Sequence, residues 1–118
     1  MGNFRKLLVW QKAMELVVKI YKLVKSQPIS KDFGLRDQIQ RAAVSIPANI
    51  AEGDELDTDK QSVRHFYIAK GSSAELQTLL LIAKEIDYTD SETIDSLVNE
   101  CLVISIMLMK IIKARSKV

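Results

Sequence analysis

The sequence predicts an all-α fold, an antiparallel up-down-up-down bundle of four helices in a single domain spanning residues 1–118. Apolar residues recur at three- and four-residue intervals over most of the chain, and no segment alternates in the way that predicts a strand. The segments between the four periodic stretches are short, which favours antiparallel neighbours. A chain of 118 residues, 47% of them hydrophobic, is long enough for one core and too short for two.

The first helix has an apolar face and an opposite polar stripe. Its expected core residues are Trp10, Ala13, Met14, Val17, Ile20, Tyr21 and Val24. The polar stripe consists of Lys12, Glu15, Lys19, Lys22 and Ser26. The Gln27-Pro28 pair is expected to end this helix, because proline disfavours the helical conformation of the residue before it.

The second helix contains a proline. Its expected core residues are Leu35, Ile39, Ala42, Ala43, Ile46 and Ile50. Pro47 lacks a backbone donor, so we expect it to kink the helix rather than to end it. We expect Glu52-Gly53 to close the helix, with Gly53 as a left-handed cap.

Two capping signals mark the starts of the third and fourth helices. The first is Thr58 followed three residues later by Gln61, and the second is Thr89 followed by Glu92. The expected core residues of the third helix are Phe66, Ala69, Ser73, Leu76, Leu80 and Ala83. Those of the fourth helix are Ile94, Leu97, Val98, Cys101, Leu102, Ser105, Leu108 and Ile112.

Three helices are apolar over more of their circumference than one core requires. A helix that covers a core on one side needs an apolar stripe of about 100° or slightly more. A second buried face against another copy of the chain explains the surplus better than a hydrophobic monomer surface or a membrane-surface helix. The surplus residues are Leu16, Val18 and Leu23, then Leu79, Leu81 and Ile82, and finally Ile104, Ile106, Met107 and Met109.

The sequence does not predict export or insertion into a membrane. Its first residues lack the apolar stretch of a secretory signal, and no apolar run approaches the ~18 residues that would span a bilayer. Cys101 is the only cysteine, which excludes an intramolecular disulfide and a cysteine-based metal site. A cytoplasmic location is therefore expected.

Two short segments combine small residues with one carboxylate on helical, apolar sequence. They are Ser45-Ile-Pro-Ala-Asn-Ile-Ala-Glu-Gly53 and Ile68-Ala-Lys-Gly-Ser-Ser-Ala-Glu-Leu76. Together with Val9-Trp-Gln-Lys-Ala-Met-Glu-Leu16, Tyr21-Lys-Leu23, Phe33-Gly-Leu35 and Gln38-Ile-Gln-Arg-Ala-Ala43, they resemble the ribosomal-RNA intervening-sequence proteins, a family of small bacterial four-helix bundles. The resemblance runs from about residue 4 to residue 86, and the fourth helix matches only in pattern.

The resemblance implies a ring-shaped homopentamer with a link to RNA. The genes of this family lie in intervening sequences of large-subunit ribosomal RNA. A relative, the accessory variability determinant of diversity-generating retroelements, is a basic pentamer that partners a reverse transcriptase and its template RNA. The implied partners are therefore RNA, a reverse transcriptase or another protein. The resemblance implies no reaction, because most members have no established activity.

Six residues of the two segments form a candidate structural motif: Asn49, Glu52, Gly53, Gly71, Ser72 and Glu75. Apolar residues flank the polar members, so we expect hydrogen bonds among them that fix the crossing of the second and third helices. Gly71 costs about 1 kcal/mol of helix propensity relative to alanine, which close approach of a neighbouring helix would offset. The alternative is that Glu52 and Glu75 form a carboxylate pair for metal or acid–base chemistry.

Residue spacing argues against that alternative. Di-metal bundles use a Glu-x-x-His spacing, whereas His65 has Ser62 three residues before it. We expect His65 to be solvated or at an interface, and Cys101 to be a small buried hydrophobe. No catalytic triad, phosphate-binding glycine loop or zinc-ligand spacing is present. We therefore expect a protein that is not an enzyme and that binds neither a metal nor a cofactor.

Charge is segregated along the chain, although the formal net charge is only +2. Residues 1–50 hold nine Lys or Arg and three acids. Residues 52–59 hold five acids, residues 85–100 hold six acids, and neither stretch contains a Lys or Arg. Residues 101–118 hold four bases and no acid: Lys110, Lys113, Arg115 and Lys117. Helix dipoles account for bases at the end of the fourth helix but not for those along the first.

The segregated bases predict a surface for RNA phosphates, made by Lys12, Lys19, Lys22, Lys110, Lys113 and Arg115. Copies in a ring would strengthen such binding through multivalency and counterion release. The seven aromatic residues are expected mostly in the core, so the contacts would be to phosphate and weakly sequence-selective. The sequence thus favours a non-enzymatic, oligomeric RNA-binding or RNA–protein adaptor. The alternative is a protein-interaction scaffold that binds no nucleic acid.

Overall fold

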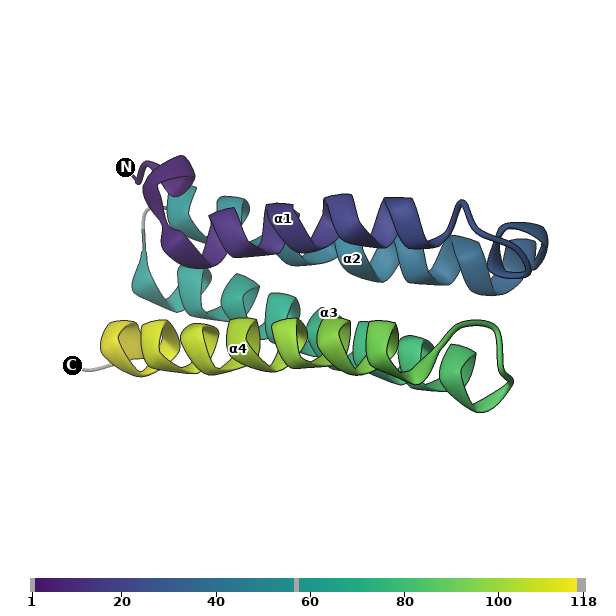
Figure 1. Cartoon of the computed structure of the whole chain (residues 1–118). Helices are drawn as coiled ribbons and strands as arrows, with labels where there is room; N and C mark the ends of the chain where they lie inside the picture. The colour runs from purple at the N-terminus through teal and green to yellow at the C-terminus, as the bar shows by residue number, and fades with distance from the viewer. Residues whose placement is uncertain (1, 57, 117–118) are drawn as a thin grey trace.

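The computed structural model describes residues 2–56 and 58–116 and consists of four long helices in an antiparallel bundle (Figure 1). They are α1 (Leu8–Leu23), α2 (Phe33–Glu55), α3 (Asp59–Glu85) and α4 (Ser91–Ser116). Short 3₁₀ helices, η1 (Phe4–Lys6) and η2 (Ile29–Lys31), precede α1 and α2. The described ranges contain no strand. The predicted all-α four-helix bundle is therefore confirmed.

Each long helix packs against two others. Helices α1 and α3 lie on opposite corners of the bundle, and both contact α2 and α4. Figure 1 shows α1 beside α2 and α4 beside α3, with the start of α1 and the end of α4 at the same end of the bundle as the end of α2 and the start of α3. The bundle measures 47 × 21 × 19 Å, and its long axis follows the helices. None of the helices, over the residues described, is long and apolar enough to cross a membrane.

The core faces of α2 and α3 agree with the sequence prediction, and those of α1 and α4 agree with it except at a few positions. On α1, Leu16 is fully buried and Met14 and Tyr21 are exposed. On α4, Ile104 is buried and Leu102 is exposed. Both helices are apolar on more than one side, so periodicity alone does not determine which side faces the core. The neighbouring helices make that choice.

Helix α2 continues beyond the point where the sequence predicted its end. Pro47 lies inside the helix, as expected, and the helix runs on to Glu55. The expected left-handed cap at Gly53 is wrong, because Gly53 is helical and no glycine of the chain has a positive φ. A Cβ at Gly53 would lie 2.8 Å from Cε1 of the buried Phe66. Gly53 therefore permits the close approach of α3 to α2.

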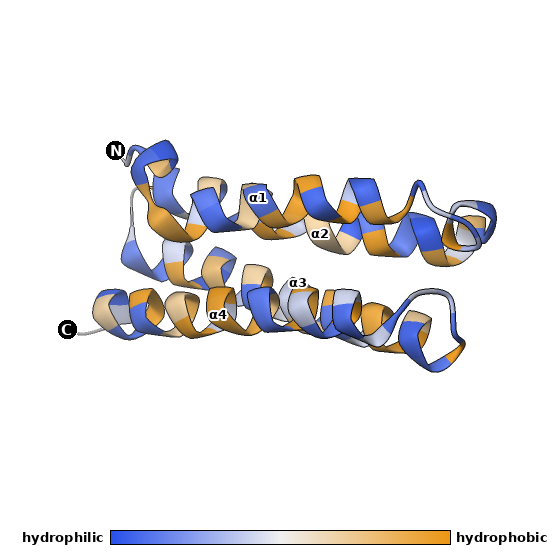
Figure 2. Cartoon of the chain, in the orientation of Figure 1, coloured by the Kyte–Doolittle hydropathy of each residue, from blue (hydrophilic) through white to orange (hydrophobic). Residues whose placement is uncertain are grey.

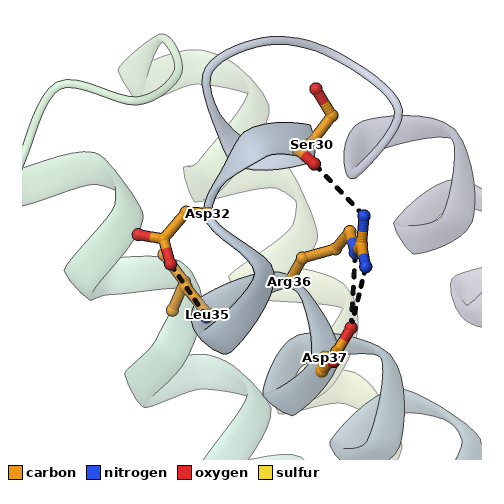
Figure 3. Close-up of polar contacts among 5 residues, drawn as sticks. All are labelled: Ser30, Asp32, Leu35, Arg36 and Asp37. Atoms are coloured by element: carbon orange, nitrogen blue, oxygen red, sulfur yellow. Dashed lines mark hydrogen bonds and ion pairs between the residues drawn. The ribbon is translucent and has the colours of Figure 1, made fainter.

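Side-chain caps fix the start of α2 (Figure 3). Asp32 precedes the helix, and its Oδ1 accepts a hydrogen bond from the Leu35 backbone N–H at 3.1 Å. One turn later, Arg36 donates to the Ser30 carbonyl oxygen and forms an ion pair with Asp37. These contacts anchor η2 to the first turn of α2, so the connection from α1 is held against the bundle.

The connection between α3 and α4 is tied to the same place. Asp87 adopts a left-handed conformation with φ of 61°, and the next residue, Tyr88, donates its backbone N–H to the Ala83 carbonyl oxygen. The Tyr88 hydroxyl donates to Oδ2 of Asp32 at 3.0 Å, which raises the pKa of Tyr88 above its ordinary value. One carboxylate therefore caps α2 and holds the α3–α4 connection.

The cap predicted for α3 is observed at Thr58, whereas the capping residue of α4 lies one residue later than predicted. Thr58 Oγ1 accepts from the Gln61 backbone N–H at 3.2 Å, as expected. At α4, however, Asp90 takes the capping position that the sequence assigned to Thr89, and it accepts from the Thr93 N–H at 2.9 Å. This backbone hydrogen bond lowers the pKa of Asp90. A carboxylate is preferred here because it also faces the positive end of the helix dipole.

Replacing Gly53 with alanine should destabilise the fold, because the added Cβ meets a buried ring that has no space to move. We expect a loss of about 1 to 3 kcal/mol, the usual range for overpacking. Gly34 is the matched control, since a Cβ there has only one neighbour within 4 Å, at 3.9 Å. Urea unfolding followed by circular dichroism measures both variants. Equal stability of the Gly53→Ala variant and the wild type would contradict this account of the α2–α3 contact.

Candidate nucleic-acid interface

The six bases predicted to bind RNA do not share one surface. Lys19 and Lys22 line a groove of about 710 Å³ between the end of α1 and the start of α4. Lys12 lines a separate groove of about 240 Å³, together with Glu15 and Glu100. The bases of α4 face other parts of the molecule. The sequence placed these groups together because α1 and α4 are antiparallel neighbours, but it did not determine which side of each helix faces outward.

Two of the six bases already have a carboxylate partner within the chain. Lys19 Nζ lies 2.9 Å from Oε2 of Glu100, and the hydrogen bond raises the pKa of Lys19. Arg115 lies 2.9 Å from Oδ1 of Asp54, whose side chain is only 5% exposed. The Arg115 guanidinium also stacks over the Phe66 ring, 5.0 Å from its centroid. Arg115 therefore closes one end of the bundle, and its charge is offset internally.

The two remaining bases of α4 lie around a groove between α3 and α4. Its lining residues are Lys70, Leu102, Ser105, Ile106, Met109, Lys110 and Lys113, and we call it the lysine groove. Its volume is about 330 Å³, and no acidic residue lines it. Within the described ranges, none of its three lysines forms an ion pair. Lys117 lies outside the described residues.

Lys70 is the member of this groove that the sequence did not single out. Its position follows from the register of α3 against α4, which two hydrogen bonds between these helices fix. Ser73 Oγ donates to the Cys101 carbonyl oxygen at 3.1 Å, and Ser105 Oγ donates to Ser73 Oγ at 2.9 Å. Lys70 lies one turn before Ser73, and Met109 one turn after Ser105, so antiparallel packing brings them together. The sequence signal that could have indicated this register was the presence of two serines, Ser73 and Ser105, at expected core positions.

Two members of the candidate structural motif lie in a hydrogen-bonded chain between α2 and α3. The hydroxyl oxygens of Ser45 and Ser72 are 2.8 Å apart. Asn49 Nδ2 donates to the carbonyl and hydroxyl oxygens of Ser45, so its Oδ1 is left to accept from Nδ1 of His65 at 3.0 Å. His65 therefore carries a proton on Nδ1. The chain connects the two helices through side chains alone.

The other motif residues do not join this chain. Glu52 and Glu75 are exposed, and neither forms a hydrogen bond or ion pair with the described side chains. Ser45 faces Ser72, and the helices run antiparallel, so Glu52 and Glu75 lie on opposite sides of this contact. At 1.5 Å of rise per residue they are about 15 Å apart along the bundle. The expected placement of these carboxylates at helix contacts is therefore wrong.

This separation also removes the geometric basis for a two-carboxylate site. Over residues 2–56 and 58–116, no group of three His, Cys, Asp or Glu side chains is arranged to hold a metal ion. The close approach of a neighbouring helix that was expected at Gly71 is also not observed among the described residues, because a Cβ at this position would have no neighbouring atom within 4 Å. Gly71 is exposed on the outer side of α3.

Replacing Asn49 with alanine should lower the stability of the protein by about 1 to 3 kcal/mol, because His65 loses its acceptor and Ser45 loses a donor. Replacing the exposed Glu75 with glutamine should change it by no more than about 0.5 kcal/mol. Chemical denaturation at low protein concentration compares the two. A larger loss for Glu75→Gln than for Asn49→Ala would show that the polar chain is not what joins α2 to α3.

Cys101 should be unreactive in the folded protein. It is fully buried, and burial raises the pKa of its thiol to about 12, so the thiolate is scarce at neutral or mildly alkaline pH. A thiol reagent at pH 8 should modify Cys101 only when urea unfolds the chain, and the modification rate should follow the unfolded fraction. Rapid labelling in native buffer would contradict the buried placement.

These features define a class of protein: a small antiparallel four-helix bundle with an apolar surface groove bordered by lysines. Residues 5–110 match the family described as 23S rRNA-intervening sequence protein, and the chain belongs to this family. A solved structure with the same fold is a protein of unknown function from the S23 ribosomal protein family of Bacteroides thetaiotaomicron. It is 28% identical, with a TM-score of 0.83, and the match covers 90% of this chain and 99% of that one. A search of curated proteins found no match.

Proposed function

We propose that this chain is a non-enzymatic, self-associating RNA-binding adaptor of the cytoplasm, and that the lysine groove contacts RNA phosphates. The observation that supports this most directly is the convergence of Lys70, Lys110 and Lys113 on one groove with no acidic lining residue. By contrast, Lys19 and Arg115 each have a carboxylate partner within the chain. Lysines without such partners can bind phosphate without first breaking an ion pair.

The groove suits an extended polyanion. Leu102, Ile106 and Met109 form its apolar floor, and the lysines lie beside them. Phosphates of a single strand can pair with the ammonium groups while sugar or base surface rests on the floor. Contacts of this kind favour many sequences alike, because phosphates carry no sequence information.

Self-association would increase the RNA affinity that a single lysine groove provides. Three lysines on one chain release few counterions, and the resulting affinity is modest at physiological salt. Several copies of the groove on one assembly engage a long RNA together, and the second contact then benefits from a high effective concentration. The family name, which refers to 23S rRNA, is consistent with an RNA partner. From the family resemblance, we expect five copies and a possible reverse-transcriptase or other protein partner.

The test is a triple variant, Lys70→Gln, Lys110→Gln and Lys113→Gln, measured for RNA binding across a salt series. We expect weaker binding to structured and single-stranded RNA alike. The slope of log affinity against log salt should become shallower by roughly 0.7 to 0.9 for each lysine–phosphate interaction that the substitutions remove. The lysines are not part of the core, so the helical circular dichroism spectrum should be unchanged.

The matched control removes three positive charges elsewhere. Lys19 and Lys84 are paired with Glu100 and Asp95, and Lys31 lies on η2, away from the groove. Replacing these three with glutamine should affect binding much less than the groove variant does. Equal losses of affinity would mean that net charge, not the groove, attracts RNA.

A protein-interaction scaffold is the second candidate, and the apolar floor of the groove favours it. An acidic amphipathic peptide would also match apolar residues bordered by lysines. Failure of the wild-type protein to bind any RNA at about 50 mM salt, where phosphate contacts are strongest, would favour this candidate over RNA.

A further inference from the structure

The floor of the lysine groove is an apolar stripe on α4 that the chain leaves open. Leu102, Ile106 and Met109 recur at the four- and three-residue spacing that places side chains on one side of a helix. Leu102 and Ile106 are 46% and 58% exposed, so neither belongs to the core. Figure 2 shows the run of hydrophobic residues in this half of α4. Lysines alone are sufficient to attract phosphate, so the apolar floor needs a separate explanation.

The three lysines surround this stripe. Lys70 borders it from α3, and Lys113 continues it one turn further along α4. Lys110 lies on the opposite side of the stripe from Ser105, whose hydroxyl bonds to α3. Positive charges therefore flank a strip about 16 Å long over residues 102–113, at 1.5 Å of rise per residue. A ligand that fits both parts has negative charges beside an apolar surface.

The floor has no free donor that could read the edge of a base. Among the described lining residues, Ser105 is the only one besides the lysines with a polar side chain. Its hydroxyl donates to Ser73 Oγ at 2.9 Å, and Ser73 in turn donates to the backbone of α4. Sequence-specific recognition of RNA uses hydrogen bonds to base edges. The floor therefore accepts the face of any base and responds only to whether that face is exposed.

An RNA duplex does not expose the faces of its bases. A protein that approaches A-form RNA meets phosphates, 2′-hydroxyls and a shallow minor groove, while the bases remain stacked inside. A duplex could cover the apolar stripe only if a base left the stack, which costs free energy. An unpaired strand offers base faces without this cost.

We propose that the lysine groove selects unpaired RNA strands over duplex RNA, and that Leu102, Ile106 and Met109 determine this selectivity. The lysines attract the phosphates of both kinds of RNA. The apolar stripe adds affinity only for a strand whose bases lie on it. This inference rests on the proposed RNA binding and adds to it the structural class of RNA that the groove takes.

The test compares three RNA probes of equal length at about 150 mM salt: an unpaired strand, a blunt duplex and an abasic strand that keeps the sugar–phosphate chain. The wild type should bind the unpaired strand more tightly than the other two, by about tenfold, which corresponds to one buried apolar contact. Ile106→Gln should lose this preference and keep its affinity for the duplex and the abasic strand. Ile106→Met should retain the preference, because methionine preserves the apolar surface.

Ile86→Gln is the matched control. Ile86 is 47% exposed and follows α3 at the other end of the bundle, so this variant removes a similar apolar surface away from the groove. It should bind all three probes as the wild type does. Light scattering should give the wild type and Ile106→Gln the same mass, because the stripe is not covered by another copy of the chain.

Three results would overturn the selectivity while leaving the lysine–phosphate contacts in place. They are equal wild-type affinities for the three probes, an Ile106→Gln variant that keeps the preference, and a change of mass in that variant. Failure of the wild type to bind any of the probes, even at about 50 mM salt, would overturn both this inference and the proposed RNA binding.

Discussion

Phe66 of α3 occupies the space that a side chain at Gly53 of α2 would need, and this contact sets the distance between the two central helices. Farther along the same pair, the helices are close enough for the hydroxyls of Ser45 and Ser72 to meet at 2.8 Å. The next residue, Ser73, bonds to the backbone of α4 and carries the register to the fourth helix. The apolar core provides most of the stabilisation, and these few polar contacts select one register among the many that apolar packing alone would allow.

The register has a direct consequence for the surface. It places Lys70 beside the last turns of α4 and so creates the lysine groove, although Lys70 and Lys110 are far apart in sequence. At the nearby end of the bundle, the buried carboxylate of Asp54 requires a partner, and Arg115 provides it. Charge on this protein is therefore divided between bases that form an ion pair with a carboxylate, such as Arg115, and bases that form none with the described residues, such as Lys70. A count of lysines and arginines does not separate the two.

The related protein from Bacteroides thetaiotaomicron shows how little of the sequence the fold requires. The two chains share 28% of their residues, and the structures superpose with a TM-score of 0.83. A four-helix bundle needs apolar residues at core positions and small residues where helices approach closely, and many sequences meet this requirement. The fold alone does not imply a function. The proposed RNA binding depends on the lysine groove.

Apolar periodicity determined the number of helices, their antiparallel order and most of the core of α2 and α3, because these depend on local spacing alone. The cap at Thr58 and the contact role of Asn49 and Ser72 were also predictable, since a polar residue on apolar helical sequence needs a partner. The tertiary structure decided the rest. It determined the exact core-facing side of α1 and α4, the close contact at Gly53, the exposure of Gly71, Glu52 and Glu75, and the pairing of Lys19 and Arg115. Each of these depends on which side of a helix meets a neighbour, and a helix that is apolar on several sides does not encode that choice locally.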